Sequence, residues 1–327
     1  MGIDDDPEFV TIKDYEANRS DDDLDTELTY LFTTKTAITT AQVGLDDLRN
    51  TLPFTLANVP KIEEVGVLDE TWDIKVTYTC AIVSEDHNVR KVAVTIRTDC
   101  EVSTKHIVCW DADGITLMVE VEGLEGYARV PNFGEQPTLY RQFPLIGSEK
   151  FYFPFMVNGD EFFPTEERDG LQLNSEEDED SLANRDIISQ AMDEAVEFAE
   201  WLVAKGAKNR YVLAYTRTPN IYWEPGARDW FKELQANWRK KIRELALVEN
   251  AEGGIATLKD AYIPKYGISK KVREEFWKHF APFHGYDVVP RLDLLHARIE
   301  ALGPEDELST WGEDYQLCFD LEDLLTG

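Results

Sequence analysis

The sequence has no run of about 18 apolar residues, the length that a membrane-spanning helix needs. Its N-terminus, MGIDDDPEF, is acidic where a secretory signal needs basic and apolar residues, so we expect a cytoplasmic protein without membrane contact. Basic residues are few as well, because 33 Lys and Arg stand against 64 Asp and Glu, a formal net charge of -31. Such a field repels phosphate backbones, so nucleic acid is not an expected partner. The acidity indicates either a highly soluble protein or a surface that docks a basic partner.

Sequence signals for several common classes of site are also missing. Neither GxxxxGK[ST] nor GxGxxG occurs, which argues against a P-loop or Rossmann enzyme. The four cysteines have no CxxC spacing, so we expect buried free thiols rather than a zinc site or disulfides. His279 and His284 are five residues apart and do not share a helical face, so no metal site is predicted. Ser148 in LIGSEK lacks the second glycine of a nucleophile elbow, so a hydrolase triad is not supported.

The patterns that are present predict an α/β fold of the α+β type. At 327 residues and 43% hydrophobic content, the chain is long enough for one large domain or two. From residue 61 to residue 123, five short segments rich in Val, Ile, Thr and aromatic residues are separated by turn signals. They predict a mixed, mostly antiparallel sheet. An irregular, buried strand-loop segment is expected from residue 142 to residue 173, where Pro and Gly interrupt a high apolar content.

Before this sheet, EFVTI and TELTYLF are strand-like, and an amphipathic pattern that starts at Thr40 predicts a helix that ends at Pro53. After the acidic string SEEDED comes the clearest helix, with Ser181 as its cap and Gly206 near its end. Its apolar stripe consists of Ile188, Met192, Ala195, Ala199 and Leu202.

The remainder of the chain is expected to be mainly helical. RYVLAYT is predicted as a strand, NIYWEPG as a turn and residues 227–247 as a second strong helix. Helical patterns follow in LKDAYIP, SKKVREEFWKHFAPF and VVPRLDLLHARIEAL, before an acidic tail with Trp311.

One stretch resembles a known family. FPLIGSEKFYFPFMVNGDEFFPTEERDGLQLN, followed by NRDIISQAMDEAVEFAEWLV, is similar to bacterial proteins with a sacsin-like ATPase region. These are relatives of the ninety-kilodalton heat-shock chaperone in the GHKL ATPase superfamily. GLDDLRNTLPFTLANVPKIEEVGV and LVENAEGGIATLKDAYIP resemble flanking pieces of the same family, so the resemblance extends over most of the chain.

The resemblance implies a role for one loop, FPTEERDGLQ. In the chaperone, a middle-domain loop brings an arginine to the terminal phosphate of ATP held in the preceding domain. Arg168 would be that arginine, Gln172 its companion, and Asn184 a nucleotide-associated asparagine that opens the following helix. The loop departs from the chaperone by one residue fewer between proline and arginine, and by Glu167 in place of a serine. The alternative is that Arg168 pairs with Glu166, Asp169 or another local acid in a surface turn.

The ATP pocket of the superfamily is missing from the sequence. We find no ExxxN helix, DxGxG segment and glycine-rich lid in order, and WDADGITL lies too late in the chain to supply them. We therefore expect an ATPase that lacks most of its N-terminal nucleotide-binding domain: an expressed fragment, a split subunit or a degenerate relative. ATP and magnesium would bind through a partner nucleotide-binding domain, in cis or in trans, and neither is expected to bind this chain alone. No metal ligand is predicted.

The resemblance also suggests boundaries. Residues 1–35 would be terminal strands of the otherwise missing nucleotide-binding domain, residues 36–205 a middle α/β domain with the arginine loop, and residues 206–327 a mainly helical C-terminal domain. This segment would couple nucleotide state to conformational change, in chaperone-like or defence work with other protein partners. Two alternatives stay open: an acidic, non-catalytic scaffold or protein-binding module, and a freestanding enzyme whose site the sequence does not reveal.

Overall fold

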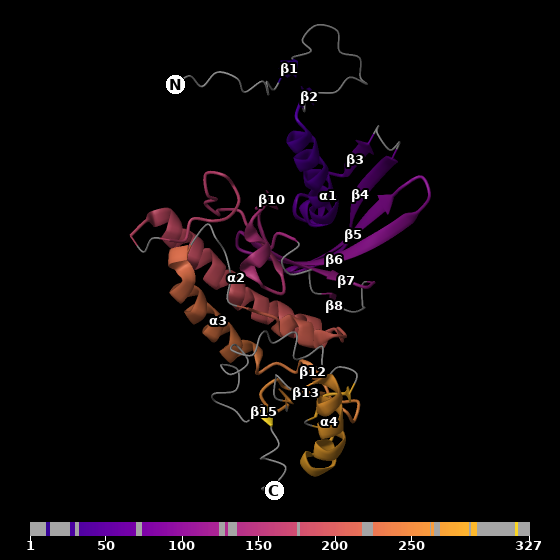
Figure 1. Cartoon of the computed structure of the whole chain (residues 1–327), viewed down its shortest axis with the longest axis vertical. Coiled ribbons are helices and arrows are strands. Elements are labelled where there is room, and N and C mark those ends of the chain that lie inside the picture. Colours follow the sequence, from indigo (N-terminus) through magenta and orange to yellow (C-terminus); the bar gives the residue numbers. More distant parts are fainter. Residues whose placement is uncertain are drawn as a thin grey trace. The chain divides into compact units, whose positions relative to one another are not determined.

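The computed structural model describes residues 11–13, 27–29, 33–69, 74–123, 128–129, 136–174, 177–217, 225–261, 263–264, 269–287, 289–292 and 318–319. Contacts within the chain define two units, Met1–Asn50 and Thr51–Gly327. Figure 1 labels the helices and most strands of both units. The two boundaries between the three predicted domains remain predictions.

Described elements of the first unit are two short strands and the start of a helix. β1 (Thr11–Lys13) pairs antiparallel with β2 (Glu27–Thr29), and all of these residues except Lys13 lie within EFVTI and TELTYLF. Helix α1 (Lys35–Asn58) begins in the first unit and ends in the second.

Pro53 lies inside α1, so the prediction that the helix ends there is wrong. An interior proline removes one backbone hydrogen bond and costs about 3 kcal/mol. All residues from Thr51 to Ala57 are buried, and burial of Leu52, Phe54 and Leu56 offsets this cost.

The second unit is built around a nine-stranded sheet, which confirms the predicted α/β class. Its first five strands are antiparallel neighbours in chain order, as the pattern over residues 61–123 predicts. They are β3 (Glu64–Asp69), β4 (Ile74–Asp86), β5 (Val89–Arg97), β6 (Val102–Ala112) and β7 (Ile115–Val121).

The sheet continues through the irregular segment. β11 (Met156–Gly159) pairs antiparallel with β7, and β9 (Leu139–Arg141) pairs parallel with β11. β10 (Phe143–Pro144) pairs antiparallel with β9, and β8 (Ala128–Arg129) pairs with β7. A short 3-10 helix, η1 (Ser148–Phe151), lies between β10 and β11.

Two helical layers cover the two faces of the sheet. On one face, the Arg90 guanidinium donates a hydrogen bond to the carbonyl of Ala57 near the end of α1. Trp110 points to the opposite face, where its indole N–H donates to Glu194 of α2 (Glu179–Ala204) at 2.8 Å. Registered pairs place Trp110, Leu117, Val157 and Leu139 in one row on that second face.

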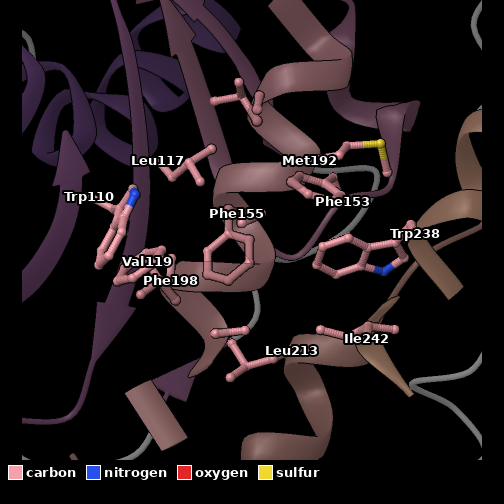
Figure 2. Close-up of a cluster of buried hydrophobic side chains, with 14 of the residues drawn as sticks. Trp110, Leu117, Val119, Phe153, Phe155, Met192, Phe198, Leu213, Trp238 and Ile242 are labelled. Atoms are coloured by element: carbon pink, nitrogen blue, oxygen red, sulfur yellow. The ribbon is translucent and has the colours of Figure 1, made fainter. Parts of the chain in front are cut away.

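The core of this second face is a chain of aromatic rings. Trp110 of the sheet stacks on Phe198 of α2 with a centroid distance of 5.7 Å, and Phe198 lies 5.0 Å from Phe155. Phe155 contacts Phe153 at 5.8 Å, and Phe153 contacts Trp238 of α3 (Arg228–Ile242) at 5.1 Å. Figure 2 shows Phe155 between the sheet residues and Trp238. One apolar core thus includes residues before and after residue 205.

Helix α2 confirms the predicted stripe, since all five of its residues are buried. Its cap differs from the prediction. Asp178 is the N-cap and accepts a hydrogen bond from the amide of Ser181 at 2.8 Å, so Ser181 lies in the first turn. An aspartate at this position also interacts favourably with the helix dipole.

Helix α3 ends at Ile242, five residues before the predicted end. The chain turns there because Leu245 and Leu247 are buried in the core, and backbone bonds from Leu258 to Leu245 and from Lys259 to Arg243 replace the helical ones. Contacts of Arg185 with Trp230, and of Asp193 with Lys241, show that α2 and α3 run in the same direction.

Two further predictions are wrong. RYVLAYT contains a 3-10 helix, η2 (Arg210–Ala214), instead of a strand, because Leu213 and Ala214 pack into the core and no described strand forms a ladder with them. LKDAYIP begins with a turn where a helix was expected, and the side chain of Thr257, directly before it, accepts from the amide of Asp260.

The last described elements include one confirmed prediction, α4 (Lys270–His284), which Ser269 caps. β12 (Val248–Glu249) pairs with β13 (Ile255–Ala256), and β14 (Ile263–Pro264) pairs parallel with β15 (Cys318–Phe319). η3 (Pro225–Ala227) starts at the end of NIYWEPG, whose first five residues lie outside the described ones. Most of VVPRLDLLHARIEAL and Trp311 also lie outside them. No helix among the described residues is both long and apolar enough to span a membrane.

Candidate functional site

The predicted arginine loop is a short hairpin that connects β11 to α2. Pro164 and Leu171 form an isolated antiparallel bridge. The amide of Thr165 donates to the carbonyl of Gly170 at 2.9 Å, and the amide of Gln172 donates to that of Phe163 at 3.2 Å. Two backbone hydrogen bonds and one bridge therefore define the hairpin, and Glu166, Glu167, Arg168 and Asp169 form its tip.

Thr165 organises this tip. Its hydroxyl donates to the carboxylate of Asp169 at 2.6 Å and accepts from the amides of Asp169 and Gly170 at 3.2 Å each. The amide of Arg168 donates to the carbonyl of Thr165 at 3.0 Å. Side-chain bonds of this type stabilise tight turns, so the tip is ordered by its own residues.

Arg168 is exposed at the tip, with a φ of 57°. Among the described residues, its guanidinium has no hydrogen-bond or ion-pair partner. The alternative that Arg168 pairs with Glu166 or Asp169 is therefore not seen, and Asp169 is instead bonded to Thr165. The guanidinium keeps its five donors available for an anion outside this loop.

Gln172 lies at the base of the hairpin rather than beside Arg168. It is half-buried, and its side-chain amide donates to the carbonyl of Pro164 at 3.4 Å. This bond closes the hairpin across its two strands. The structure thus brings Gln172 together with Asn184, while Arg168 projects from the opposite end of the loop.

Asn184 does not open α2, which begins at Glu179, so that prediction is wrong. It is fully buried in the second turn of the helix, and its side chain faces the hairpin. The side-chain oxygen accepts from the amide of Phe163 at 2.8 Å. The side-chain nitrogen donates to the carbonyls of Phe163 at 2.8 Å and of Gln172 at 2.9 Å. Both N–H groups of the amide are therefore used by the loop backbone. Its predicted association with a nucleotide remains a prediction.

A second contact involves Gly147, which sequence reasoning missed. Gly147 has a φ of 129°, and a Cβ at this position would lie 2.2 Å from the carbonyl oxygen of Asp169. No side chain fits in that space, so only glycine allows this close approach. The segment that carries Gly147 is held to β9 by Ser148, whose hydroxyl accepts from the amide of Leu139 at 3.0 Å and donates to the carbonyl of Leu145 at 2.8 Å.

Ser148 is fully buried, and these bonds use its hydroxyl in the structure. Arg185, another missed residue, donates from Nε and Nη2 to the carbonyl of Leu173 and lies 5.4 Å from the ring centre of Trp230. It links the end of the arginine loop to both α2 and α3. The nearest sequence signal for these contacts of Arg185 was its position directly after Asn184.

The acidic segment WDADGITL has a structural role in this fold. Both carboxylate oxygens of Asp111 accept from the Arg90 guanidinium at 2.9 Å, and Oδ1 also accepts from the Thr116 hydroxyl. Asp113 has a φ of 28° in the turn between β6 and β7. Asp111 is therefore committed to a pair that ties the sheet to α1.

The described thiols are free, as expected, but the expectation that they are buried is met only in part. Cys109 is free and buried, Cys80 is free and half-buried, and Cys100 is free but exposed. Burial raises the pKa of Cys109 to about 12 and raises that of Cys80 as well, despite the nearby charge of Arg90. No group of three or more His, Cys, Asp or Glu within the described ranges is arranged to hold a metal ion.

Comparison of the chain with protein-family models, curated proteins and solved structures finds no match. The resemblance to the sacsin-like ATPases remains a prediction that depends on the quoted motifs. The site is accordingly defined by its geometry: an ordered hairpin, an exposed arginine at its tip, and a buried asparagine and a glycine where it meets the fold.

Proposed function

We propose that this chain is the middle segment of a sacsin-like GHKL ATPase, which supplies Arg168 to ATP held by a partner nucleotide-binding domain. The observation that carries the proposal is an exposed guanidinium without an ion-pair partner among the described residues, on a hairpin fixed by hydrogen bonds to the buried side chain of Asn184. Arg97, Arg141 and Arg228 are also exposed and without an ion-pair partner among the described residues, so the distinguishing feature of Arg168 is its place at the tip of an ordered hairpin. A planar guanidinium suits the oxygens of a phosphoryl group, which it can bind with two parallel hydrogen bonds.

The chemistry asked of Arg168 is electrostatic. Charge develops on the phosphoryl oxygens during transfer, and a positioned arginine lowers the barrier by neutralising it. Where such arginines have been removed from other phosphoryl-transfer enzymes, the rate falls by on the order of a thousandfold. We propose Gln172 as the residue that keeps the hairpin closed behind Arg168, through its bond to Pro164.

ATP and magnesium would be held by the partner domain, in cis or in trans, in the cytoplasm. Glu166 and Glu167 directly precede Arg168 and are exposed, and their charges oppose capture of free nucleotide by this loop. This supports a nucleotide that is delivered by another domain. Movement of that domain onto the loop would then couple the state of the nucleotide to conformation.

The test is ATP turnover in the assembly of this chain with its nucleotide-binding domain. Arg168→Ala is expected to reduce kcat by roughly a hundredfold or more, with Arg168→Lys between the two because lysine keeps the charge but not the planar fork. Arg141→Ala is the matched control, an exposed arginine of β9 outside the hairpin. Turnover that is the same in Arg168→Ala and in the unaltered assembly would contradict the proposal.

A further inference from the structure

The arginine hairpin has two kinds of support, which do different things. The bonds of Thr165 and the backbone pair between Thr165 and Gly170 stay inside the hairpin. They fix the shape of the tip but cannot fix its place in the fold. The position of Arg168 relative to the rest of the chain must come from contacts between the hairpin and its surroundings.

Asn184 provides such a contact from α2. Its one side-chain amide bonds the N–H and C=O of Phe163 on one strand of the hairpin and the C=O of Gln172 on the other. The bonds, at 2.8 to 2.9 Å, have the ordinary length of N–H···O hydrogen bonds, and the side chain is fully buried. A single residue of the helix therefore holds both strands of the hairpin at its base.

Gly147 provides a contact from the other side. Its Cα faces the carbonyl of Asp169 at the tip, at a separation that leaves no room for a Cβ. The buried bonds of Ser148 and Thr138 fix this segment to β9, because Thr138 donates to the carbonyl of Ser148 at 2.8 Å. Asp169 directly follows Arg168, so Gly147 limits where the tip can go.

We infer that Asn184 is a positioning residue for Arg168 and not a ligand of the nucleotide, and that Gly147 is the surface against which the tip rests. Both donors of the Asn184 amide are occupied by the loop, and the residue has no exposed surface to offer a ligand. The consequence for turnover rests on the proposed function, whereas the consequence for the loop does not.

Hydrogen exchange of the intact chain tests the inference without a partner domain. In Asn184→Ala, amides of the hairpin, including those of Phe163, Thr165 and Gln172, are expected to exchange about tenfold faster or more, because three bonds that close it are lost. Exchange in β5 and β6 should stay the same. Gln190→Ala, an exposed amide of the same helix, is the matched control and should leave the hairpin protected. Unchanged hairpin exchange in Asn184→Ala would overturn the inference.

Two more variants keep the test decisive. If Asn184→Ala does not fold, Asn184→Ser can replace it, because serine retains a hydroxyl that can make one of the three bonds. Exchange of the hairpin amides is then expected to be accelerated by a smaller factor. Gly147→Ala should accelerate exchange of the Asp169 and Gly170 amides, since the Cβ of the new alanine displaces the tip of the hairpin. Protection at the tip that survives Gly147→Ala would remove Gly147 from the inference.

Turnover of the assembled ATPase separates positioning from general damage. Asn184→Ala is expected to lower kcat about tenfold or more while KM for ATP stays within about twofold, because ATP is held elsewhere. If Arg168→Ala leaves turnover unchanged but Asn184→Ala loosens the hairpin, the proposed function fails and the positioning of the loop stands. If Arg168→Ala abolishes turnover but Asn184→Ala loosens nothing, the proposed function stands and the inference fails.

Discussion

Trp238 allows the packing of α3 onto the sheet core to be tested with a sharp contrast between two substitutions. The side chain is 1% exposed and contacts Phe153 at 5.1 Å, at the end of the aromatic chain that starts at Trp110 (Figure 2). Its indole N–H is buried and has no acceptor among the described residues. Burial of the ring therefore stabilises the fold, while the unpaired donor subtracts from that contribution.

The magnitudes follow from these two terms. A tryptophan buries about 150–250 Å², which at ~25 cal/mol per Å² is worth about 5 kcal/mol. A buried donor without a partner costs ~1–3 kcal/mol. We expect Trp238→Ala to lower the free energy of unfolding by about 3 kcal/mol, within the range of core truncations. Trp238→Phe keeps most of the apolar area and removes the unpaired donor, so its cost should stay below about 1 kcal/mol.

Equilibrium urea unfolding, followed by far-ultraviolet circular dichroism, measures both values through the midpoint and the slope. Glu233→Ala, an exposed position on the same helix, is the control and should change stability by no more than ~0.5 kcal/mol. If Trp238→Phe costs as much as Trp238→Ala, the indole N–H has a partner and the reasoning fails. If Trp238→Ala costs no more than the control, α3 does not share a core with the sheet.

Three further predictions concern thiol labelling, the pH dependence of stability and the loop backbone. At pH 8 a thiol reagent should modify exposed Cys100 rapidly and leave Cys109 intact until the protein unfolds, which mass spectrometry of the labelled peptides can check. Burial raises the Cys109 pKa from 9.0 to about 12, so the contribution of this thiol to stability is complete below pH 9.0 and is lost as the pH rises towards 12. A Cys109→Ala variant whose stability falls equally between pH 9.0 and 12 would contradict this origin of the pH dependence. Arg168→Gly is expected to be as stable as Arg168→Ala or more stable by up to ~1 kcal/mol, since glycine adopts a φ of 57° without strain; a clearly less stable glycine variant would show that the backbone is not left-handed in solution.

The sheet and the main helix could be predicted because their signals are local. Segments from residue 61 to residue 123 alternate between two faces, and cross-strand neighbours are joined by short turns, so each signal lies within a few residues. In α2 the buried stripe repeats at helical spacing, and burial of the entire stripe enforces the pattern.

The wrong predictions concern segments in which long-range packing, rather than the local sequence, determines the backbone. Pro53 stays helical because its neighbours are buried, although a proline alone predicts an end. RYVLAYT has the composition of a strand, but Leu213 and Ala214 are taken into the core beside α2 and no strand pairs with them in the described part of the chain. Composition indicates burial in such segments, and the available partners determine the backbone.

The candidate site likewise contains one residue that the sequence could indicate and others that it could not. Arg168 could be singled out from its loop, because one cation among acids next to Gly170 is visible in sequence. Gly147 could not, because the carbonyl that requires it belongs to Asp169, 22 positions further along the chain by residue number. The clamp by Asn184 depends on a helix that folds back on the loop, so its hydrogen bonds become visible only in three dimensions.

The backbone of Arg168 itself argues for a role of its side chain. A left-handed conformation costs a non-glycine residue ~1–2 kcal/mol, and such strain persists where the surroundings over-determine it. Glycine would suit the backbone better at this position, and the side chain present gains no ion pair within the described chain in return. Glu166 and Glu167 add an opposing field, which in water is worth about 1 kcal/mol at 4 Å and would weaken capture of a free phosphate. A cation that is strained, without an ion-pair partner and flanked by acids is poorly suited to recruit an anion from solution. The same cation is well suited to meet a phosphate that another domain already holds, because docking then supplies the proximity that the local field opposes.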